Sequence, residues 1–316
     1  MGSVNSEKQI EETTMFFDRT AERLKNGLTT TFRNWIKRDG STEFKPELNR
    51  YHLYVSYACP WAHRALVVRI LKGLEHVISY STVHWFLEEG GWKFTKEYPD
   101  PHHSEDFTHL KNVYTLSDPN YDGNITVPTQ KIVNNESSEI IRMLNSEFNE
   151  YAKNSLDLYP EQLRSQIDSI NDEVYPKLNN GVYRAGFAKN QEAYESAFND
   201  VFYMLDKIEA ILSKQRYLVD NKILTEADIR LWTTLIRFDP VYVTHFKCNK
   251  YLVTKDYPNI YGYMCEIYQM NGIKETVNMF HIKNHYFQSH THINPTKIVP
   301  LGPEIDYTKP HKRDKF

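Results

Sequence analysis

The sequence predicts two structural units, an α/β domain followed by an all-α domain. Residues 51–55 are a short β-rich run, and a tight turn containing Cys59 separates them from a strongly apolar helical segment. From about residue 151 onward the pattern becomes helical. These observations give the expected division: an N-terminal extension over 1–45, an α/β domain over 46–150, a helical domain over 151–284 and a surface tail over 285–316.

The expected elements of the α/β domain begin in the order strand, turn, helix, strand. Residues 51–55 and 77–83 are rich in β-branched and aromatic side chains, and residues 62–71 carry apolar side chains all around a helix. Residues 84–123 lack clean periodicity, so we expect a long loop with short pieces of structure. Asn and Ser residues precede 140–148, which makes them suitable N-caps for a further helix.

The helical domain carries two clear sequence signals. Within residues 197–212, apolar side chains fall on one face of a 3.6-residue period. Thr225 precedes a second helical stretch, and Asp228 follows three residues later. Thr at the N-cap and Asp at the third helical position can exchange hydrogen bonds with the backbone, so we expect a helix to begin here.

Composition and net charge exclude several classes of function. The 316 residues carry 38 Lys and Arg against 41 Asp and Glu, so no general positive field would attract nucleic acid. No apolar run approaches the roughly 18 residues of a membrane span. The aromatic content of 14% fits a pocket for flat molecules, but it fits an aromatic-rich core equally well.

The N-terminal residues and the cysteine count indicate a reducing compartment. Residues 1–14 carry three Glu and lack both an apolar core and an arginine-rich face, so neither a secretory signal nor a transit peptide is expected. Gly2 begins a short match to the myristoylation pattern, without a supporting basic patch. Three cysteines are a poor basis for a disulfide framework, and we therefore expect a cytoplasmic protein.

Cys59 is the sharpest chemical signal in the sequence. At a strand-to-helix turn, helix amides and the helix dipole favour the thiolate and lower the thiol pKa towards or below neutrality. Pro60 suits the first helical position, and His63 and Arg64 can add positive charge. Position 62 is Ala62 rather than a second Cys, which excludes a dithiol cycle and leaves a single-thiol cycle completed by an external thiol. A buried structural Cys is the alternative.

Two further segments suit a ligand that ends in an α-amino acid. Val127 and Pro128 lie in an expected strand over 125–129, where a cis proline would let the preceding backbone pair with a peptide ligand; an edge or turn device is the alternative. Glu136 and Ser137 precede a helix, whose free amides and Ser hydroxyl can bind a carboxylate while Glu136 takes an ammonium group. Simple helix capping is the alternative for that pair.

The sequence gives little support for metal or nucleotide chemistry. No nucleotide-binding glycine motif, serine-hydrolase elbow or zinc-protease motif occurs. Residues 102–106 read His-His-Ser-Glu-Asp, but adjacent His side chains point apart and the spacing fits no standard ligand set. Cys248 and Cys265 have no partners at metal-ligand spacing and are expected to be core or half-buried thiols. We therefore expect no bound metal.

Taken together, these segments resemble the Xi class of glutathione transferases, the S-glutathionyl-hydroquinone reductases, a class related to the omega transferases. The resemblance covers about residues 30–305. It is carried by motifs at 59–64, 90–92, 127–128, 132–140, 181–187 and 236–239, and in the tail by 281–283, Tyr286 and 293–303. Separated motifs in a shared order are specific, whereas any one of them alone would not be.

The resemblance implies a thioredoxin-like N-terminal domain with a mixed sheet, an all-helical glutathione-transferase C-terminal domain and a homodimer. It implies that Cys59 attacks the glutathionyl sulfur of a glutathionylated aromatic molecule, a glutathionyl-hydroquinone. The hydroquinone leaves, and a second glutathione resolves the Cys59–glutathione mixed disulfide to oxidised glutathione. The residues implied to hold glutathione are Trp92, Val127, Pro128, Glu136 and Ser137. Tyr183 and Tyr286 are implied to line the aromatic site, where a phenol can protonate the leaving ring.

The chain departs from the family pattern after Pro128. Only residues 129–131 separate this proline from Ile132, where the family usually has a longer β-hairpin, and two strands cannot pair through so short a link. The family also often carries a basic residue near position 124, where this chain has Asn124. The short link affects whether the third and fourth strands form and where Glu136 lies relative to Cys59. The missing basic residue could reduce glutathione affinity.

Two other functions stay open at the level of sequence. An omega-like thioltransferase or dehydroascorbate reductase would share Cys59 and differ in its preferred substrate. A non-catalytic binding protein on a transferase fold would account for the short link after Pro128.

Overall fold

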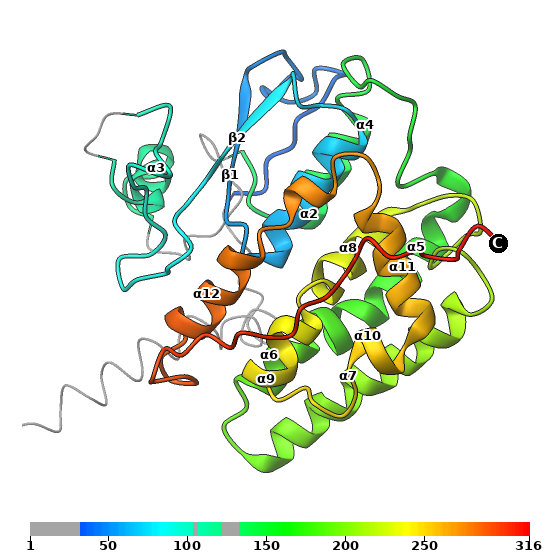
Figure 1. Ribbon diagram of the computed structural model, residues 1–316. Coiled ribbons are helices and arrows are strands. Elements are labelled where there is room, and N and C mark those ends of the chain that lie inside the picture. Colours follow the sequence, from blue (N-terminus) through cyan, green and yellow to red (C-terminus); the bar gives the residue numbers. More distant parts are fainter. Residues whose placement is uncertain (1–31, 104–106, 122–132) are drawn as a thin grey trace, which may run out of the picture.

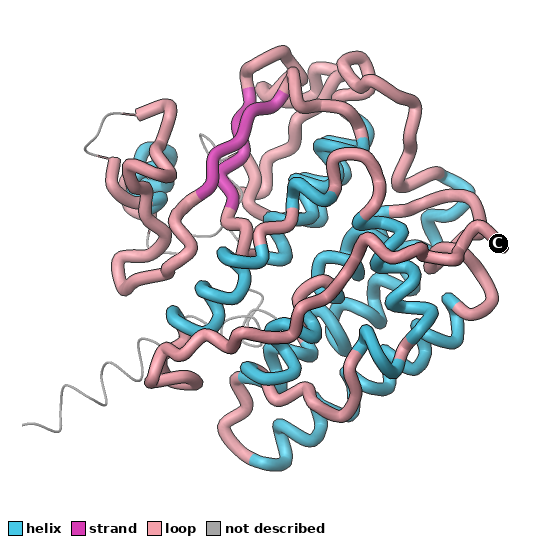
Figure 2. Tube along the Cα trace, in the orientation of Figure 1, coloured by secondary structure: helices cyan, strands magenta, loops and turns pink. Residues whose placement is uncertain are grey.

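A computed structural model of the protein describes residues 32–103, 107–121 and 133–316. The described strands lie in the first half, together with helices, and every described element of the second half is a helix (Figure 1; Figure 2). The elements of the first half are β1 (Tyr51–Val55), α2 (Pro60–Leu71), β2 (Ile78–Thr82), α3 (Leu110–Ser117) and α4 (Ser137–Ser146). Those of the second half are η1 (Glu161–Leu163), α5 (Arg164–Val174), η2 (Tyr175–Asn179), α6 (Gly181–Gly186), α7 (Gln191–Leu212), α8 (Glu226–Leu235), η3 (Phe238–Tyr242), α9 (Val243–His245), α10 (Val253–Asp256), α11 (Pro258–Tyr268), η4 (Lys274–Thr276) and α12 (Met279–Ser289).

The sheet is built from the strands that the sequence predicts. β1 and β2 run parallel, in a register that pairs Tyr51 with Ile78 and Val55 with Thr82. Parallel neighbours need a crossover connection, and α2 supplies it. Val127, Pro128 and the short link that follows them lie outside the described residues, so the prediction about the third and fourth strands stays a prediction.

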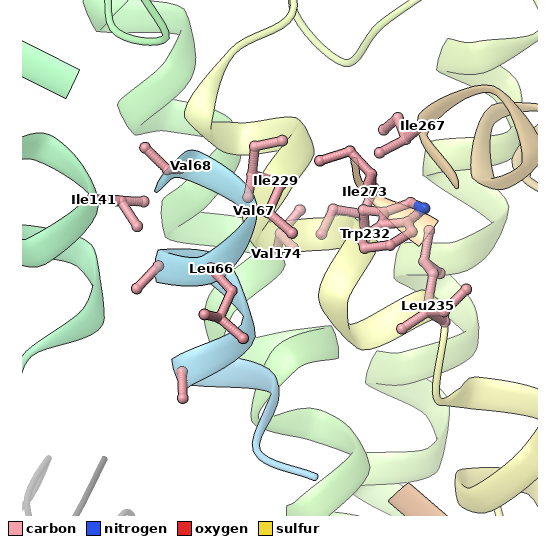
Figure 3. Packing of buried hydrophobic residues seen from close by; sticks show 14 of the residues in the cluster. Leu66, Val67, Val68, Ile141, Val174, Ile229, Trp232, Leu235, Ile267 and Ile273 are labelled. Carbon is pink, nitrogen blue, oxygen red and sulfur yellow. The ribbon is translucent and has the colours of Figure 1, made fainter. Parts of the chain in front are cut away.

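Helix α2 is the central helix of the protein, as its apolar composition predicts. Figure 3 shows Leu66, Val67 and Val68 of α2 between Ile141 of α4 on one side and Ile229 of α8 on the other. All five side chains are buried. Because α2 packs against both domains, its N-terminal end lies at the boundary between them, and so does the cysteine that precedes it.

Helix starts in the second half follow the expected capping chemistry. α7 begins six residues earlier than the periodic segment predicts, because the Asn190 side chain accepts a hydrogen bond from the backbone N–H of Ala193 at 2.8 Å. At the start of α8, the backbone N–H of Thr225 donates to Asp228 Oδ2 at 2.8 Å. The Thr225 hydroxyl completes the reciprocal box, which confirms the predicted helix start.

Helix α12 links the C-terminal half to the long loop of the N-terminal half. The expected domain boundary at residue 284 falls inside this helix, which is orange in Figure 1. His285 Nδ1 lies 3.1 Å from the carbonyl oxygen of Trp85, and His281 Nε2 lies 2.9 Å from the hydroxyl of Tyr98. The described part of the loop expected over 84–123 therefore contacts α12, and it includes helix α3.

The two ends of the described chain also contact the folded core. Arg33 forms a backbone bridge with Asn134 at the edge of the α/β domain. The C-terminal segment runs over the helical domain (red in Figure 1), where Arg313 is 2% exposed and donates from Nη2 to the Gln215 and Arg216 carbonyl oxygens at 2.6 Å. A guanidinium just beyond the C-terminal end of α7 suits the negative end of the helix dipole.

Among the described residues, no helix is both long and apolar enough to cross a membrane.

Candidate active site

Cys59 lies where the sequence places it, between β1 and α2. It is the N-cap residue of α2, with Pro60 in the first helical position. The preceding turn is held locally, because the Cys59 N–H donates to the Ser56 carbonyl at 3.1 Å and the Ala58 N–H contacts the Ser56 hydroxyl at 3.2 Å. The sulfur therefore faces the first amides of a helix, in a residue that is partly exposed as a whole.

The predicted depression of the Cys59 pKa is wrong as a net effect. Burial raises the pKa of the thiol above its ordinary value, and this exceeds the lowering by the backbone amides of Ala62 and Trp61. The positive charges of Arg237 and Arg64 lower the pKa further, without reversing the sign. Local sequence shows the amides and one of these cations, but it does not show how densely protein surrounds the sulfur.

His63 does not supply the positive charge that was expected of it. Its side chain is 1% exposed, and its two ring nitrogens contact Arg237 Nη1 at 3.1 Å and Thr276 Oγ1 at 2.7 Å. Burial, aided by the charge of Arg237, lowers the pKa of His63 well below its ordinary value. This imidazole is therefore neutral, because a second buried cation next to Arg237 would be strongly unfavourable.

Arg64 does supply a charge, between the start of α2 and the start of α4. The guanidinium lies 4.4 Å from the centre of the Trp61 ring, and Nη1 and Nη2 contact Ser137 Oγ at 3.4 Å and Asn179 Oδ1 at 3.2 Å. Burial lowers the pKa of Arg64 to about 9, so the group stays protonated at neutral pH. Its position connects Cys59 with the residues expected to bind an amino-acid group.

Glu136 and Ser137 begin α4, three residues before the predicted start. Glu136 is the N-cap residue, and its Oε1 accepts from the backbone N–H of Ser138 at 3.2 Å and from the Ser138 hydroxyl at 3.0 Å. The capping role that was the alternative for this pair is therefore present. Binding of glutathione by Glu136 and Ser137 stays a prediction, for which the helix N-terminus and Arg64 provide a suitable positive environment.

Trp92 is packed against α12. It is 7% exposed, and its ring centre lies 5.0 Å from that of His285. Its predicted contact with glutathione, like that of Val127 and Pro128 outside the described residues, stays a prediction.

Three tyrosine hydroxyls meet near the cysteine. Tyr183 of α6 and Tyr286 of α12 are brought together as the aromatic-site prediction requires, with 2.5 Å between their hydroxyl oxygens. Tyr242 of η3 was missed at the level of sequence, and its hydroxyl lies 3.2 Å from that of Tyr286. The Trp61 ring, two residues from Cys59, stacks on Tyr183 at 6.3 Å. The only sequence signal for Tyr242 was its position just after the 236–239 motif.

These phenols hold their protons strongly. Burial raises the pKa of Tyr183 well above its ordinary value, and Tyr242, Tyr286 and Cys59 raise it further. Burial also raises the pKa of Tyr286 well above its ordinary value and raises that of Tyr242. A set of neutral phenols next to a sulfur can donate hydrogen bonds or a proton to an oxygen-bearing ring.

Neutral histidines pack behind Tyr286. The ring centres of His245, His285 and His290 lie 6.2, 5.2 and 5.5 Å from that of Tyr286. Burial lowers the pKa of His245 to about 3 and that of His285 to about 4, and it lowers that of His290 well below the ordinary value. The phenols are therefore surrounded by uncharged rings.

The adjacent histidines at 102 and 103 point to different partners, as expected from their spacing. His102 packs on the ring of His52 at 4.3 Å, and His103 Nδ1 lies 2.7 Å from Asp100 Oδ2. Residues 104–106, the rest of that motif, lie outside the described ones. Within the described ranges, no group of three or more His, Cys, Asp or Glu side chains could hold a metal ion.

The fold and the site together define a class of protein. A single cysteine begins the first helix of an α/β domain, and an all-helical domain brings phenols to it. This combination is that of a thiol-dependent transferase with a thioredoxin-like domain.

Comparisons with known proteins identify the family. Residues 58–147 match the model of the glutathione S-transferase N-terminal domain, and residues 191–264 match that of the C-terminal domain. The glutathionyl-hydroquinone reductase YqjG of Escherichia coli is 51% identical over 301 residues, which cover 90% of this chain and 90% of that protein. The glutathionyl-hydroquinone reductase PcpF of Sphingobium chlorophenolicum is 48% identical over 269 residues, which cover 82% of this chain and 85% of that protein.

Solved structures agree. The glutathione-bound structure of YqjG superimposes with a TM-score of 0.86 at 50% identity, covering 92% of this chain and 98% of that one. The Xi-class transferase of Natrialba magadii gives a TM-score of 0.87 at 47% identity, covering 91% and 90%. The chain therefore belongs to the glutathione S-transferase family, within its Xi class. This confirms the resemblance and the predicted fold of a thioredoxin-like domain followed by a helical domain.

Proposed function

We propose that this protein is a glutathione-dependent reductase that removes glutathione from S-glutathionyl-hydroquinones. The observation that carries the proposal is the cluster of the Tyr183, Tyr242 and Tyr286 hydroxyls, of which Tyr183 and Tyr242 interact electrostatically with the single cysteine Cys59. Two relatives that are about half identical over most of the chain, YqjG and PcpF, are glutathionyl-hydroquinone reductases, which supports the proposal.

In the first step, the thiolate of Cys59 attacks the glutathionyl sulfur of the substrate. A sulfur–sulfur bond forms and the bond from sulfur to the aromatic ring breaks. The electron pair of the broken bond stays with the ring carbon, which takes a proton and becomes the free hydroquinone. We infer that Tyr183 and Tyr286 hydrogen-bond the ring oxygens and deliver that proton, because burial raises the pKa of both and keeps them protonated.

In the second step, a glutathione thiolate attacks the glutathionyl sulfur of the mixed disulfide. Oxidised glutathione leaves and Cys59 returns as a thiolate. The two electrons that reduce the ring in the first step come one each from the Cys59 sulfur and the glutathionyl sulfur of the substrate. The incoming glutathione then reduces Cys59, so the net donors are the two sulfurs that leave together as oxidised glutathione. Both steps require a glutathione site beside Cys59, for which we propose Trp92, Val127, Pro128, Glu136 and Ser137, the last with Arg64 behind it.

The test is reduction of glutathionyl-menadiol by the intact protein with glutathione supplied. We expect Cys59→Ser to abolish turnover. Cys248→Ala and Cys265→Ala are matched controls, because both remove a buried thiol outside this site, and both should retain turnover. An active Cys59→Ser variant would overturn the proposal.

The same preparation separates the alternatives. A clear preference for dehydroascorbate or a small disulfide would favour an omega-like thioltransferase; the three phenols favour an aromatic substrate instead. Calorimetric binding of glutathione without turnover of any of these substrates would favour a non-catalytic binding protein.

The family also leads us to propose a homodimer in the cytoplasm. Light scattering of the purified protein tests the first point and cell fractionation tests the second.

A further inference from the structure

Arg237 reaches from the helical domain into the turn that carries Cys59. It follows the end of α8 and is fully buried. Its Nε donates to the Ala58 carbonyl at 2.9 Å, and its Nη2 donates to the Tyr57 carbonyl at 2.9 Å. Two consecutive carbonyls immediately before the reactive sulfur are thus held by one rigid guanidinium.

The remaining N–H groups of Arg237 begin a chain of hydrogen bonds in which each group donates to the next. Nη1 donates to the Thr233 carbonyl at 2.6 Å and to His63 Nδ1 at 3.1 Å. Since that nitrogen accepts, His63 carries its proton on Nε2 and donates to Thr276 Oγ1 at 2.7 Å. The Thr276 hydroxyl in turn donates to the Ile273 carbonyl at 2.6 Å. These hydrogen bonds connect α8, α2 and η4, and they hold the guanidinium on the side away from the Tyr57 and Ala58 carbonyls.

None of the described carboxylates pairs with Arg237. The nearest acid in sequence, Asp239, is engaged elsewhere, because its carboxylate accepts from the Val253 and Thr254 N–H groups at 2.8 and 2.9 Å. A buried cation surrounded only by neutral acceptors is electrostatically uncompensated, which is costly unless an anion forms nearby. The arrangement therefore favours negative charge close to Arg237.

Cys59 is the group best able to supply that charge. The charged and titratable groups that act on it are Arg237, Arg64 of α2, Tyr183 of α6 and Tyr242 of η3. Both tyrosines stay protonated because burial raises their pKa above an already high value. A thiol ionises more readily than a phenol, so Cys59 is the neighbour that becomes the counter-ion of the guanidinium when it gives up its proton for the attack.

We propose that Arg237 is a positioning residue for Cys59, which holds the turn before the sulfur and supplies the charge against which the thiolate forms. The proposal deepens the proposed function and rests on it only for its role in turnover. In the mixed disulfide the sulfur is neutral and the guanidinium loses its counter-charge. Attack by glutathione then releases the Cys59 sulfur as a thiolate and restores the pair, so Arg237 promotes both the attack and the departure of Cys59.

The test is the pH dependence of Cys59 alkylation by iodoacetamide, followed by mass spectrometry of the Cys59 peptide. The pH at which the alkylation rate is half-maximal, the alkylation midpoint, reports the ionisation of the thiol. In Arg237→Met this midpoint should rise by about one pH unit or more, because an opposite charge next to a thiolate is removed. In Arg237→Lys the positive charge remains, but the planar guanidinium that bonds two carbonyls at once is lost. We therefore expect a midpoint close to that of the wild type, together with a lower kcat on glutathionyl-menadiol.

Arg313→Met is the matched control. Arg313 is another buried arginine whose guanidinium donates to backbone carbonyls, at the end of α7 and remote in sequence from the Cys59 turn. Its loss should lower the Tm and leave the alkylation midpoint unchanged. If Arg237→Met does not fold, Arg237→Gln keeps two donors without the charge and takes its place, with the same expected rise.

The two proposals fail separately. Iodoacetamide alkylation needs no glutathione, so an Arg237-dependent midpoint in a protein that does not turn over glutathionyl-menadiol would contradict the proposed function alone. Normal turnover with the same midpoint in the wild type and Arg237→Met would overturn the role of Arg237 alone. Equal shifts in Arg237→Met and Arg313→Met would also overturn it, since the effect would then follow from general destabilisation.

Discussion

The active site has two sides that differ in charge. On one side, Arg64 and Arg237 are buried guanidinium groups with no carboxylate partner among the described residues, and the first amides of α2 point the same way. On the other side, Tyr183, Tyr242 and Tyr286 are phenols whose protons burial holds in place. We call these the cationic side and the phenolic side.

The difference indicates a division of work between sulfur and oxygen. The cationic side stabilises negative charge on sulfur, which both steps of the proposed reaction need. The phenolic side keeps protons available for a ring that leaves with extra electrons. Burial raises the pKa of the thiol and of the phenols alike. The amides of α2 and the two cations lower only that of the thiol, and this distinguishes the two sides.

The largest expected effect that separates the two sides is that of Tyr286→Phe. Removing this hydroxyl takes away the one that contacts both other phenols, and we expect kcat on glutathionyl-menadiol to fall about 100-fold, as for loss of a general acid. The alkylation midpoint of Cys59 should not move. A midpoint that shifts as far as it does in Arg237→Met would show that the two sides do not act separately.

Acid should destabilise the protein through buried histidines such as those behind the phenolic side. The pKa of His245 is lowered to about 3 and that of His285 to about 4, so between the unfolded-state value near 6.5 and these values the unfolded chain binds more protons than the folded protein. Stability is therefore complete above about pH 6.5 and is lost as the pH falls towards 4. Thermal unfolding against pH measures this loss.

The variant His285→Gln should reduce the acid-induced loss of stability, because one of the depressed imidazoles is gone. His76→Gln is its control, since His76 is exposed on the surface. Identical pH profiles for both variants and the wild type would contradict a role for the buried histidines.

A smaller effect is expected from Tyr242→Phe. This hydroxyl acts through Tyr286, at 3.2 Å, so we expect kcat to fall about tenfold or less and KM to stay close to that of the wild type. Steady-state kinetics give both constants. A loss as large as that of Tyr286→Phe would mean that Tyr242 itself contacts the substrate.

The smallest effect is expected from Ser137→Ala on the cationic side. The variant removes a long, 3.4 Å contact with Arg64, so the Cys59 alkylation midpoint should stay within about 0.3 unit of the wild type. The KM for glutathione should rise a few-fold, which reports the proposed carboxylate site at the start of α4. Ser146→Ala, at the other end of the same helix, is the control and should leave that KM unchanged.

Local sequence predicted the parts of the site that depend on neighbours in the chain. The strand, turn and helix around Cys59 follow from composition and from Pro60. Tyr183 and Tyr286 required the family resemblance, because their hydroxyls meet across 103 residues. Arg237 was not singled out, since nothing in its own segment indicates that it bonds carbonyls 179 and 180 residues earlier.

The error about His63 has the same origin. A histidine next to a reactive cysteine suggests positive charge, but this one accepts a hydrogen bond from a buried arginine and is therefore neutral. The sign of a charge in the interior depends on partners from other domains, which a local pattern does not contain.

The position of helix α12 limits how domains can be exchanged between this protein and its relatives. It carries Tyr286 to the site, and its Ser289 hydroxyl accepts from the Leu87 N–H at 3.0 Å, in the long loop of the other domain. A hybrid enzyme joined at the usual boundary between the two domains would separate this helix from the loop that orients it. The unit that must be transplanted whole is thus discontinuous in sequence: the loop at 84–109 together with the helix 170 residues later.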